Sequence, residues 1–295
     1  MKRYWTLENV IFEVVVTLLL IIILVMCVLP LLNVVALSFS SREAATAGQV
    51  SFLPVDPTFA NYEYLMQDSR FFDAFLVSTK RVLLGGGINL VLSLFMAYPL
   101  SMSKNRFPAR DKYMWLLIFC MLFSAGIVPW YFAVHYTGIM DSIWALVLPG
   151  AVPVFNVILL MNFFRNLPGA VRESAELDGC GEFNMLFKIY IPLAKPSIAT
   201  ITLFSVVSHW NNFFDGMILI NTASKVPLQT YIQAMAIRTS DMSTLGLSAE
   251  QMMAVMSQRT FNAAKIVIST VPILLIYPFM QRYFVAGITL GSVKE

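Results

Sequence analysis

The side chains of this chain that could do chemistry are polar groups embedded in long apolar segments. A polar residue in such a segment is costly unless it faces a cavity or another helix. Amide and imidazole groups donate and accept hydrogen bonds, and beside aromatic rings they suit a solute that carries hydroxyl groups. The candidates are Asn156, His209, Trp210, Asn211, Asn212 and Asp215. The alternative for each is a hydrogen bond between helices or a position at an external helix end.

Lys80 and Arg81 are adjacent basic residues early in another apolar segment. Such side chains can extend to lipid headgroups along their aliphatic stems. If they face a solute path instead, they would pair with carboxylates through charge-assisted hydrogen bonds. The second interpretation predicts an acidic solute.

The sequence contains no constellation for covalent, metal-assisted or nucleotide chemistry. No nucleophile–base pair and no metal-ligand spacing is evident, and no G-x-x-x-x-G-K-[ST] phosphate loop is present. Cys27, Cys120 and Cys180 form no plausible disulfide framework. We therefore expect no catalytic residue, no bound metal or cofactor, and no nucleic-acid partner.

The elements that position these residues are membrane helices. Apolar residues make up 58% of the 295 residues and charged residues 13%, whereas soluble domains average roughly 45–50% and about 25%. The apolar residues form continuous runs that do not alternate with a period of two, which argues against a β-barrel. About 20 helical residues cross a bilayer. We predict an all-α membrane protein, in a single domain of residues 1–295.

Six apolar runs predict six transmembrane helices. The first is too long for the roughly 7–15-residue apolar region of a signal peptide, so we interpret it as an uncleaved span. The six runs are Val10–Ser38, Phe72–Met102, Tyr113–Val134, Ile143–Phe164, Ile198–Ile220 and Ala263–Phe284.

Basic residues are concentrated in alternate connections and set the predicted orientation. They precede the first run, crowd the second and fourth connections, and follow the last run (Lys2, Arg3, Lys104, Arg106, Arg110, Lys112, Arg165, Arg172, Lys188, Lys195, Arg282 and Lys294). The first and third connections hold fewer for their length. Both termini and the fourth connection are therefore expected to be cytoplasmic.

Proline and glycine positions raise two further expectations. Pro149 and Pro153 could bend the fourth span beside a translocation path, because each removes a backbone donor; ordinary membrane-helix composition is the alternative. Gly85, Gly86 and Gly87 could allow a close helix contact or a flexible bend.

Residues 168–192 form a polar cassette between the fourth and fifth spans. Pro168 suits the first turn of a helix, and Gly179 suits its end because glycine readily adopts positive φ. A second helix over Glu182–Ile191 would align Phe183, Leu186, Phe187 and Tyr190 in one apolar stripe. An amphipathic loop lying on lipid headgroups is the alternative.

This cassette resembles the EAA loop of carbohydrate-type ABC importer permeases. The matching residues are Glu173, Ser174, Ala175, Asp178, Gly179, Ile189 and Pro192, with Ser174 in place of the usual alanine. Residues 97–101 (AYPLS), 144–146 (WAL), 149–150 (PG), 210–211 (WN), 227–229 (PLQ) and 287–295 agree with the family as well. The chain is similar to the smaller maltose permease subunit and most similar to permeases associated with polysaccharide and oligosaccharide uptake.

The resemblance implies the partners and the working cycle. A second homologous permease subunit, two ATPase subunits that hold ATP and Mg²⁺, and an extracytoplasmic solute-binding protein complete such a transporter. Glu173, Ser174, Ala175, Asp178, Gly179 and Pro192 would then belong to a cytoplasmic coupling helix that docks on an ATPase. Residues 223–262 would form an external loop and residues 287–295 a cytoplasmic tail.

The predicted function is that of a permease subunit importing an oligosaccharide by alternating access across the bacterial cytoplasmic membrane. If Lys80 and Arg81 face the path, an acidic sugar such as an oligouronate is expected. One alternative is a permease for another solute, such as glycerol phosphate. Another is a secondary transporter, which requires an acidic residue inside the membrane; Asp215 is the one candidate well inside a late span.

Overall fold

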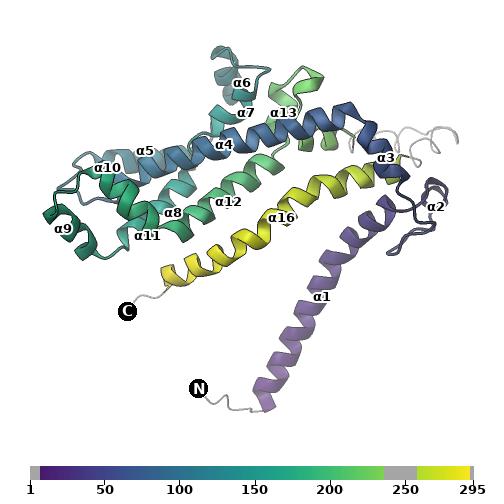
Figure 1. The fold of residues 1–295 in the computed structure, drawn as a ribbon, viewed down its shortest axis with the longest axis horizontal. Coiled ribbons are helices and arrows are strands. Elements are labelled where there is room, and N and C mark those ends of the chain that lie inside the picture. The colour runs from purple at the N-terminus through teal and green to yellow at the C-terminus, as the bar shows by residue number, and fades with distance from the viewer. Residues whose placement is uncertain (1–6, 236–257, 293–295) are drawn as a thin grey trace. The chain divides into compact units, whose positions relative to one another are not determined.

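The computed structural model describes residues 7–235 and 258–292. All elements in those residues are helices, which confirms the all-α prediction (Figure 1). The chain forms two compact units, one of residues 1–69 and 234–270 and one of residues 70–233 and 271–295. The expectation of a single domain spanning residues 1–295 stays a prediction.

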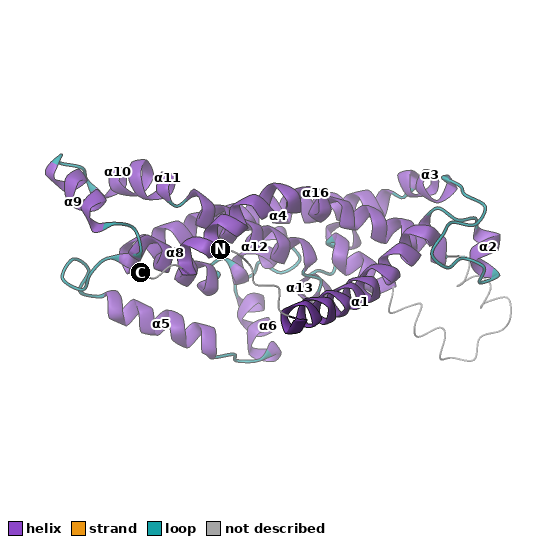
Figure 2. Ribbon diagram, turned by 90° about the horizontal axis from the view of Figure 1, so that it is seen from below, coloured by secondary structure: helices purple, strands orange, loops and turns teal. Residues whose placement is uncertain are grey.

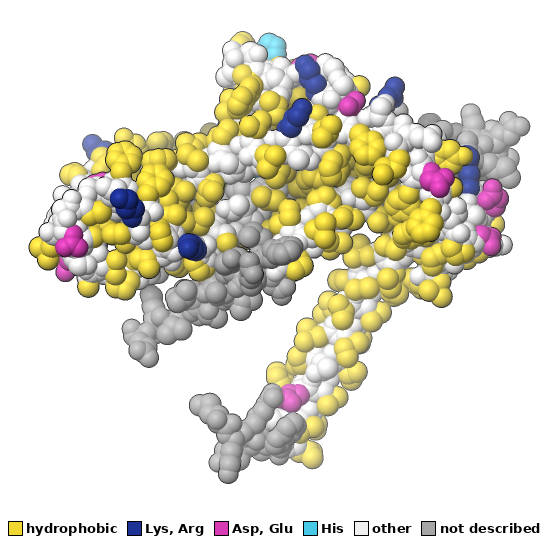
Figure 3. All heavy atoms as spheres, viewed as in Figure 1, with side chains coloured by type: hydrophobic (Ala, Val, Ile, Leu, Met, Phe, Trp, Pro, Cys, Tyr) yellow, Lys and Arg dark blue, Asp and Glu magenta, His cyan; other side chains and the backbone are white. Residues whose placement is uncertain are grey.

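The first unit contains one long apolar helix and two short ones. These are α1 (Leu7–Ser38), α2 (Arg42–Thr46) and α3 (Ala60–Gln67), followed by the start of α16 (Arg259–Ser292). Apolar side chains cover most of the visible surface of α1, as expected of a helix that faces lipid (Figure 3). Asn61 ties α3 to the end of α1 by donating to the carbonyls of Ser38 and Ser40.

The second unit holds the remaining described elements. They are α4 (Ser69–Ser101), α5 (Arg110–Leu122), α6 (Ile127–Tyr136), α7 (Ile143–Val147), η1 (Leu148–Gly150), α8 (Val154–Arg165), α9 (Gly169–Leu177), α10 (Glu182–Asn184), the π-helix η2 (Met185–Tyr190), α11 (Ile191–Leu193), α12 (Lys195–Asn211), α13 (Phe214–Leu219) and η3 (Ala223–Lys225). In both ribbon views α9 and α10 lie at one end of this unit (Figures 1 and 2).

Within the described residues, three of the six predicted spans are single helices. Residues 7–38, 69–101 and 259–278 are each long and apolar enough to cross a membrane. Three further spans are possible only as bent pairs, with α5 and α6 meeting at 117°, α7–η1 and α8 at 46°, and the α10–α11 segment and α12 at 84°. The third, fourth and fifth predicted spans are therefore each divided by a bend.

Each break has a local cause. Gly126 adopts a φ of 84° between α5 and α6, a conformation that ends a right-handed helix. Pro149 and Pro153 border the break before α8, as the sequence predicted. The predicted fifth run ends early because Asn212 adopts an extended backbone and its side-chain oxygen accepts from the Phe214 N–H, which starts α13.

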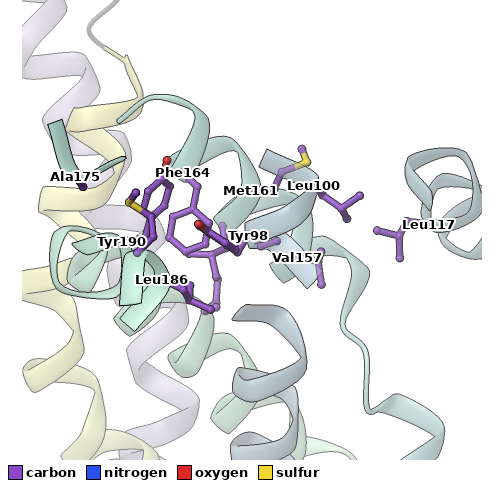
Figure 4. Close-up of a cluster of buried hydrophobic side chains, with 14 residues drawn as sticks. Tyr98, Leu100, Leu117, Val157, Met161, Phe164, Ala175, Leu186 and Tyr190 are labelled. Carbon is purple, nitrogen blue, oxygen red and sulfur yellow. The ribbon is translucent and has the colours of Figure 1, made fainter. Parts of the chain in front are cut away.

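The core of the second unit joins α4, α8 and the segment that precedes α12. Tyr98, Phe164 and Tyr190 point toward one another at its centre (Figure 4). Their ring centroids lie 5.1–6.4 Å apart in edge-to-face arrangements, which are favourable for aromatic pairs. This contact fixes the ends of α4 and α8 against the cassette.

The cassette folds as helix, glycine turn and helix, with one departure from the prediction. Gly179 has a φ of 75°, which confirms the predicted turn. The predicted apolar stripe was wrong, because Leu186 and Tyr190 are buried whereas Phe183 and Phe187 are 73% and 51% exposed. The π-helical turns of η2 explain the difference, since they alter the spacing of 3.6 residues per turn on which the stripe was drawn.

The two remaining boundary predictions fall partly outside the described residues. Within residues 223–262, the structure describes η3, helical residues 228–235 and the first residues of α16, but not residues 236–257. Within residues 287–295, α16 continues to Ser292, and residues 293–295 lie outside the description. Lys2 and Arg3, used for the orientation, also lie outside it.

Candidate functional site

A cavity of about 1110 Å³ lies in the second unit, lined by two helix breaks and by one face each of α4 and α12. The turn at Gly126 and the break between Gly150 and Pro153 both contribute to its wall. Polar side chains gather there in an otherwise apolar protein: Arg81, Asn89, Asn156, His209, Asn212 and Asp215. The volume falls at or slightly above the range of ligand sites, which is about 300–1,000 Å³.

Only two of the four consecutive candidates in the predicted fifth span line the cavity. Successive residues of an α-helix point about 100° apart, so His209, Trp210 and Asn211 cannot all face one cavity, and Asn212 follows the end of α12 in an extended conformation. His209 and Asn212 line the cavity. Trp210 is buried edge-on against Phe75, with ring centroids 5.6 Å apart. Asn211 is exposed and does not line the cavity.

Of the adjacent basic residues Lys80 and Arg81, only one lines the cavity. Lys80 is exposed and absent from the cavity wall, whereas Arg81 is only 2% exposed and lines it. Arg81 pairs with both carboxylate oxygens of Asp215, and its Nη1 also donates to the Asn212 carbonyl at 3.1 Å. A buried charge needs such a partner. Because the opposite charges of Arg81 and Asp215 cancel, the pair adds no net charge to the cavity wall.

The sequence left open whether Asn156 faces a cavity or joins two helices by hydrogen bonds, and in the structure it does both. Its amide nitrogen donates to the Ile201 carbonyl at 3.2 Å and to Ser205 Oγ at 3.1 Å, which joins α8 to α12. The residue also lines the cavity.

Asn89, which sequence reasoning missed, connects three parts of the cavity wall. Its amide nitrogen donates to the carbonyls of Gly150 and Ala151, and its oxygen lies 2.5 Å from His209 Nε2. The signal was available, because Asn89 is a polar residue in the middle of an apolar run and such residues have a structural or functional reason.

Gly85 allows the close contact that the sequence suggested. A Cβ at this position would lie 2.5 Å from Cε1 and Nε2 of His209. The glycine therefore lets the imidazole ring pack directly on the backbone of α4. A Cβ at Gly87 would meet nothing within 4 Å, so this requirement is specific to Gly85.

A second site lies on the cassette, where α9 presents an exposed surface. Glu173, Ser174 and Asp178 are exposed, and Leu177 is 90% exposed, whereas Ala175 is buried. Pro192 follows the π-helix at the start of α11, on the other side of the glycine turn.

A charged network holds α9 in place. Arg172 bonds to Glu176 at 2.7 Å and to Glu182 at 2.8 Å. Glu176 also pairs with Arg106, and Glu182 accepts from the Tyr98 hydroxyl, so α9 and α10 are linked to the end of α4. The hydrogen bond from Arg106 lowers the pKa of Glu176 to about 2.

Among the residues that the structure describes, the charged residues of this network pair with one another, whereas the carboxylates on the exposed face of α9 do not. The sequence assigned Glu173 and Asp178 to a partner, and in the described part of the chain neither forms an ion pair. Arg172 and Glu182, which the sequence did not single out as a pair, serve the internal attachment.

No group of three or more His, Cys, Asp or Glu residues that could hold a metal ion occurs among the described residues.

Comparisons with known proteins place this chain in a family. Residues 76–290 match the family described as binding-protein-dependent transport system inner membrane component. The chain is 36% identical over 292 residues to the polygalacturonan/rhamnogalacturonan transport system permease protein YtcP of Bacillus subtilis (strain 168), covering 98% of this chain and 100% of that protein.

Two further similarities extend over most of the chain. Protein LplC of Bacillus subtilis (strain 168) is 38% identical over 267 residues, covering 90% of this chain and 89% of that protein. The solved structure of a bacterial ABC transporter involved in the import of the acidic polysaccharide alginate contains a chain with 31% identity and a TM-score of 0.85, covering 96% of this chain and 100% of that one.

Proposed function

The chain belongs to the family of binding-protein-dependent transport system inner membrane components, and from this premise we propose that it imports an oligosaccharide as the permease subunit of an ATP-driven transporter. The observation that carries the proposal is a cavity lined by amides, an imidazole and an ion pair, in the same helical unit as an exposed helix suited to docking. Alternating access would expose this cavity to each side in turn.

The proposed cargo is an acidic oligosaccharide of the oligouronate class. This follows the names of two similar proteins, one for polygalacturonan or rhamnogalacturonan transport and one for alginate import. In the described residues of the cavity wall the one Arg or Lys side chain is Arg81, and Asp215 neutralises it. We therefore assign the selection of acidic sugars chiefly to the solute-binding protein.

We propose that transport is driven by a pair of ATPase subunits, one of which docks on α9. The exposed Leu177 supplies an apolar contact, and Glu173 and Asp178 supply charges that the fold does not use internally. The network from Arg172 to Glu182 and Tyr98 would carry the motion of α9 into α4. ATP and Mg²⁺ would be held by the ATPase subunits, and this chain would catalyse no reaction.

The proposed assembly also includes a second, homologous permease subunit and a solute-binding protein on the outer face. The basic residues of the second and fourth connections support cytoplasmic termini and a cytoplasmic α9. A secondary transporter is not favoured, because the carboxylate of Asp215 is held by Arg81 and by the Gly216 N–H.

Docking is tested by exchanging an exposed leucine for aspartate. Leu177→Asp on α9 should prevent an affinity-tagged permease from retaining the ATPase subunit during purification. Leu53→Asp, at a residue 78% exposed in the first connection, is the matched control and should retain it. Equal retention by both variants would refute docking on α9.

Cargo is tested separately, by uptake competition. Unlabelled trigalacturonate should compete with the transported sugar, and maltotriose should compete weakly, while a thermal-shift assay on the binding protein should show the same order. The opposite order in both assays would refute an acidic cargo while leaving the docking result unaffected.

A further inference from the structure

We propose that His209 accepts a hydrogen bond from a sugar hydroxyl, and that Asn89 is the positioning residue that fixes the imidazole for this role. The inference rests on the proposed function, because it is the proposed function that makes a sugar the ligand of the cavity. It adds the chemical group of the sugar that is recognised and the atom that recognises it.

The orientation of the Asn89 amide follows from its partners. The nitrogen lies 2.8 Å from the Gly150 oxygen and 3.2 Å from the Ala151 oxygen. Both are backbone carbonyls at the break before α8, and a carbonyl oxygen can only accept. The amide therefore presents its NH₂ group to the break, and this requirement directs its oxygen toward α12.

The amide oxygen then determines the tautomer of the imidazole. His209 Nε2 lies 2.5 Å from Asn89 Oδ1, and an amide oxygen cannot donate. Nε2 must therefore carry the hydrogen. In the neutral ring the other nitrogen is then an acceptor with a free lone pair.

The acceptor nitrogen is available to a ligand in the cavity. The ring edge formed by Cδ2, Nε2 and Cε1 faces Gly85, which leaves Nδ1 on the other side of the ring. His209 lines the cavity, and within the described part of the chain Nδ1 has no hydrogen-bond partner. It is not among the unpartnered nitrogen and oxygen atoms that are sealed from solvent.

An acceptor discriminates between the two groups that an acidic sugar offers. An ionised carboxylate has no hydrogen to donate and gains nothing at Nδ1, whereas a hydroxyl group donates well. His209 is thus assigned to a hydroxyl group of the sugar ring, while the acidic group is recognised elsewhere. Ser205, Ser208 and Asn212 also line the cavity, along or directly after the same helix α12, so neighbouring hydroxyl groups have partners too.

The tautomer is measured by nitrogen NMR on the complete transporter in lipid nanodiscs. The chain contains only two histidines, so ¹⁵N-histidine labelling of this subunit in the His135→Gln background leaves the His209 signals alone. We expect a neutral Nε2–H ring whose Nδ1 resonance moves when trigalacturonate is supplied with the binding protein and ATP. A ring protonated at Nδ1, or an Nδ1 resonance unmoved by a sugar that is imported, would overturn the inference.

Transport kinetics provide the second readout. His209→Phe and Asn89→Leu should each raise the KM for trigalacturonate uptake by about tenfold, the value of one hydrogen bond at the upper end of its usual range. Asn89→Leu should also convert the His209 signal to a mixture of tautomers, a change that a purely structural role would not require. Asn211→Ala, at a residue that does not line the cavity, is the control and should keep the wild-type KM.

The two hypotheses fail in different ways. If the wild-type transporter imports neither trigalacturonate nor maltotriose, the proposed function is refuted and the inference falls with it. If the wild type imports either sugar and both variants keep its KM, the inference alone is refuted.

Discussion

Replacing Gly85 with alanine tests the packing of the imidazole against α4. The new Cβ would lie 2.5 Å from two atoms of the His209 ring, whereas carbon atoms in contact rest at about 3.5–4.0 Å. The ring must therefore retreat by about 1 Å. That shift would lengthen the bond of 2.5 Å between Nε2 and Asn89 Oδ1 beyond the usual limit of about 3.2 Å.

The magnitude combines three contributions. Overpacking costs about 1–3 kcal/mol, and the loss of the hydrogen bond adds about 1 kcal/mol. Alanine regains about 1 kcal/mol over glycine inside a helix, so the net destabilisation is about 1–3 kcal/mol. In a chain of this size we expect the thermal unfolding midpoint of the purified transporter to fall by several degrees, at about 2–4 °C per kcal/mol.

Gly87→Ala is the matched control, because nothing lies within 4 Å of its Cβ position, and it should leave the midpoint unchanged or raise it. In a His209→Ala background, Gly85→Ala should also lose its penalty. The reasoning is refuted if both glycine variants behave alike, or if the penalty of Gly85→Ala persists after the ring is removed.

Three further predictions concern the turn, the ion pair and the cassette network. Gly179→Ala should cost about 1–2 kcal/mol because φ is 75° there; it should reduce ATPase retention in pull-downs, while Gly181→Ala, at φ −72°, should not. Arg81→Leu and Asp215→Leu should each destabilise the protein by about 3–5 kcal/mol, and the double variant should recover most of the unfolding midpoint; single variants with wild-type midpoints would contradict a buried pair. The lowered pKa of Glu176 means that its ion pairs stabilise the folded state fully above about pH 4.5 and are lost as the pH falls through about 2; hydrogen exchange in α9 should accelerate across that range, and Glu176→Gln should remove the dependence.

Long apolar runs were predictable because a single physical requirement sets them. The runs Val10–Ser38 and Phe72–Met102 correspond to α1, at Leu7–Ser38, and α4, at Ser69–Ser101, within three residues at each end. Satisfying every backbone group inside a membrane favours an unbroken helix. The turn at Gly179 was predictable for a similar reason, since glycine adopts positive φ without a steric penalty.

The breaks and the cavity depended on contacts between segments far apart in sequence. The bend between α5 and α6 carries one glycine, Gly126, at the hinge and no proline between the two helices, so composition alone did not mark it. Asn89 acquires its role from carbonyls about 60 residues later and from a ring 120 residues later. Four adjacent candidates from His209 to Asn212 could be divided only once the rotation of α12 and its end at Asn211 were known.

The measurement that tests the central claim most directly is import by the reconstituted transporter in proteoliposomes. This permease would be combined with its partner permease, the ATPase subunits and the binding protein, and labelled trigalacturonate would be followed inside the vesicles. The account predicts accumulation that requires both ATP and the binding protein and that ceases in the Leu177→Asp variant. Accumulation driven by an ion gradient without ATP, or unchanged in that variant, would contradict it.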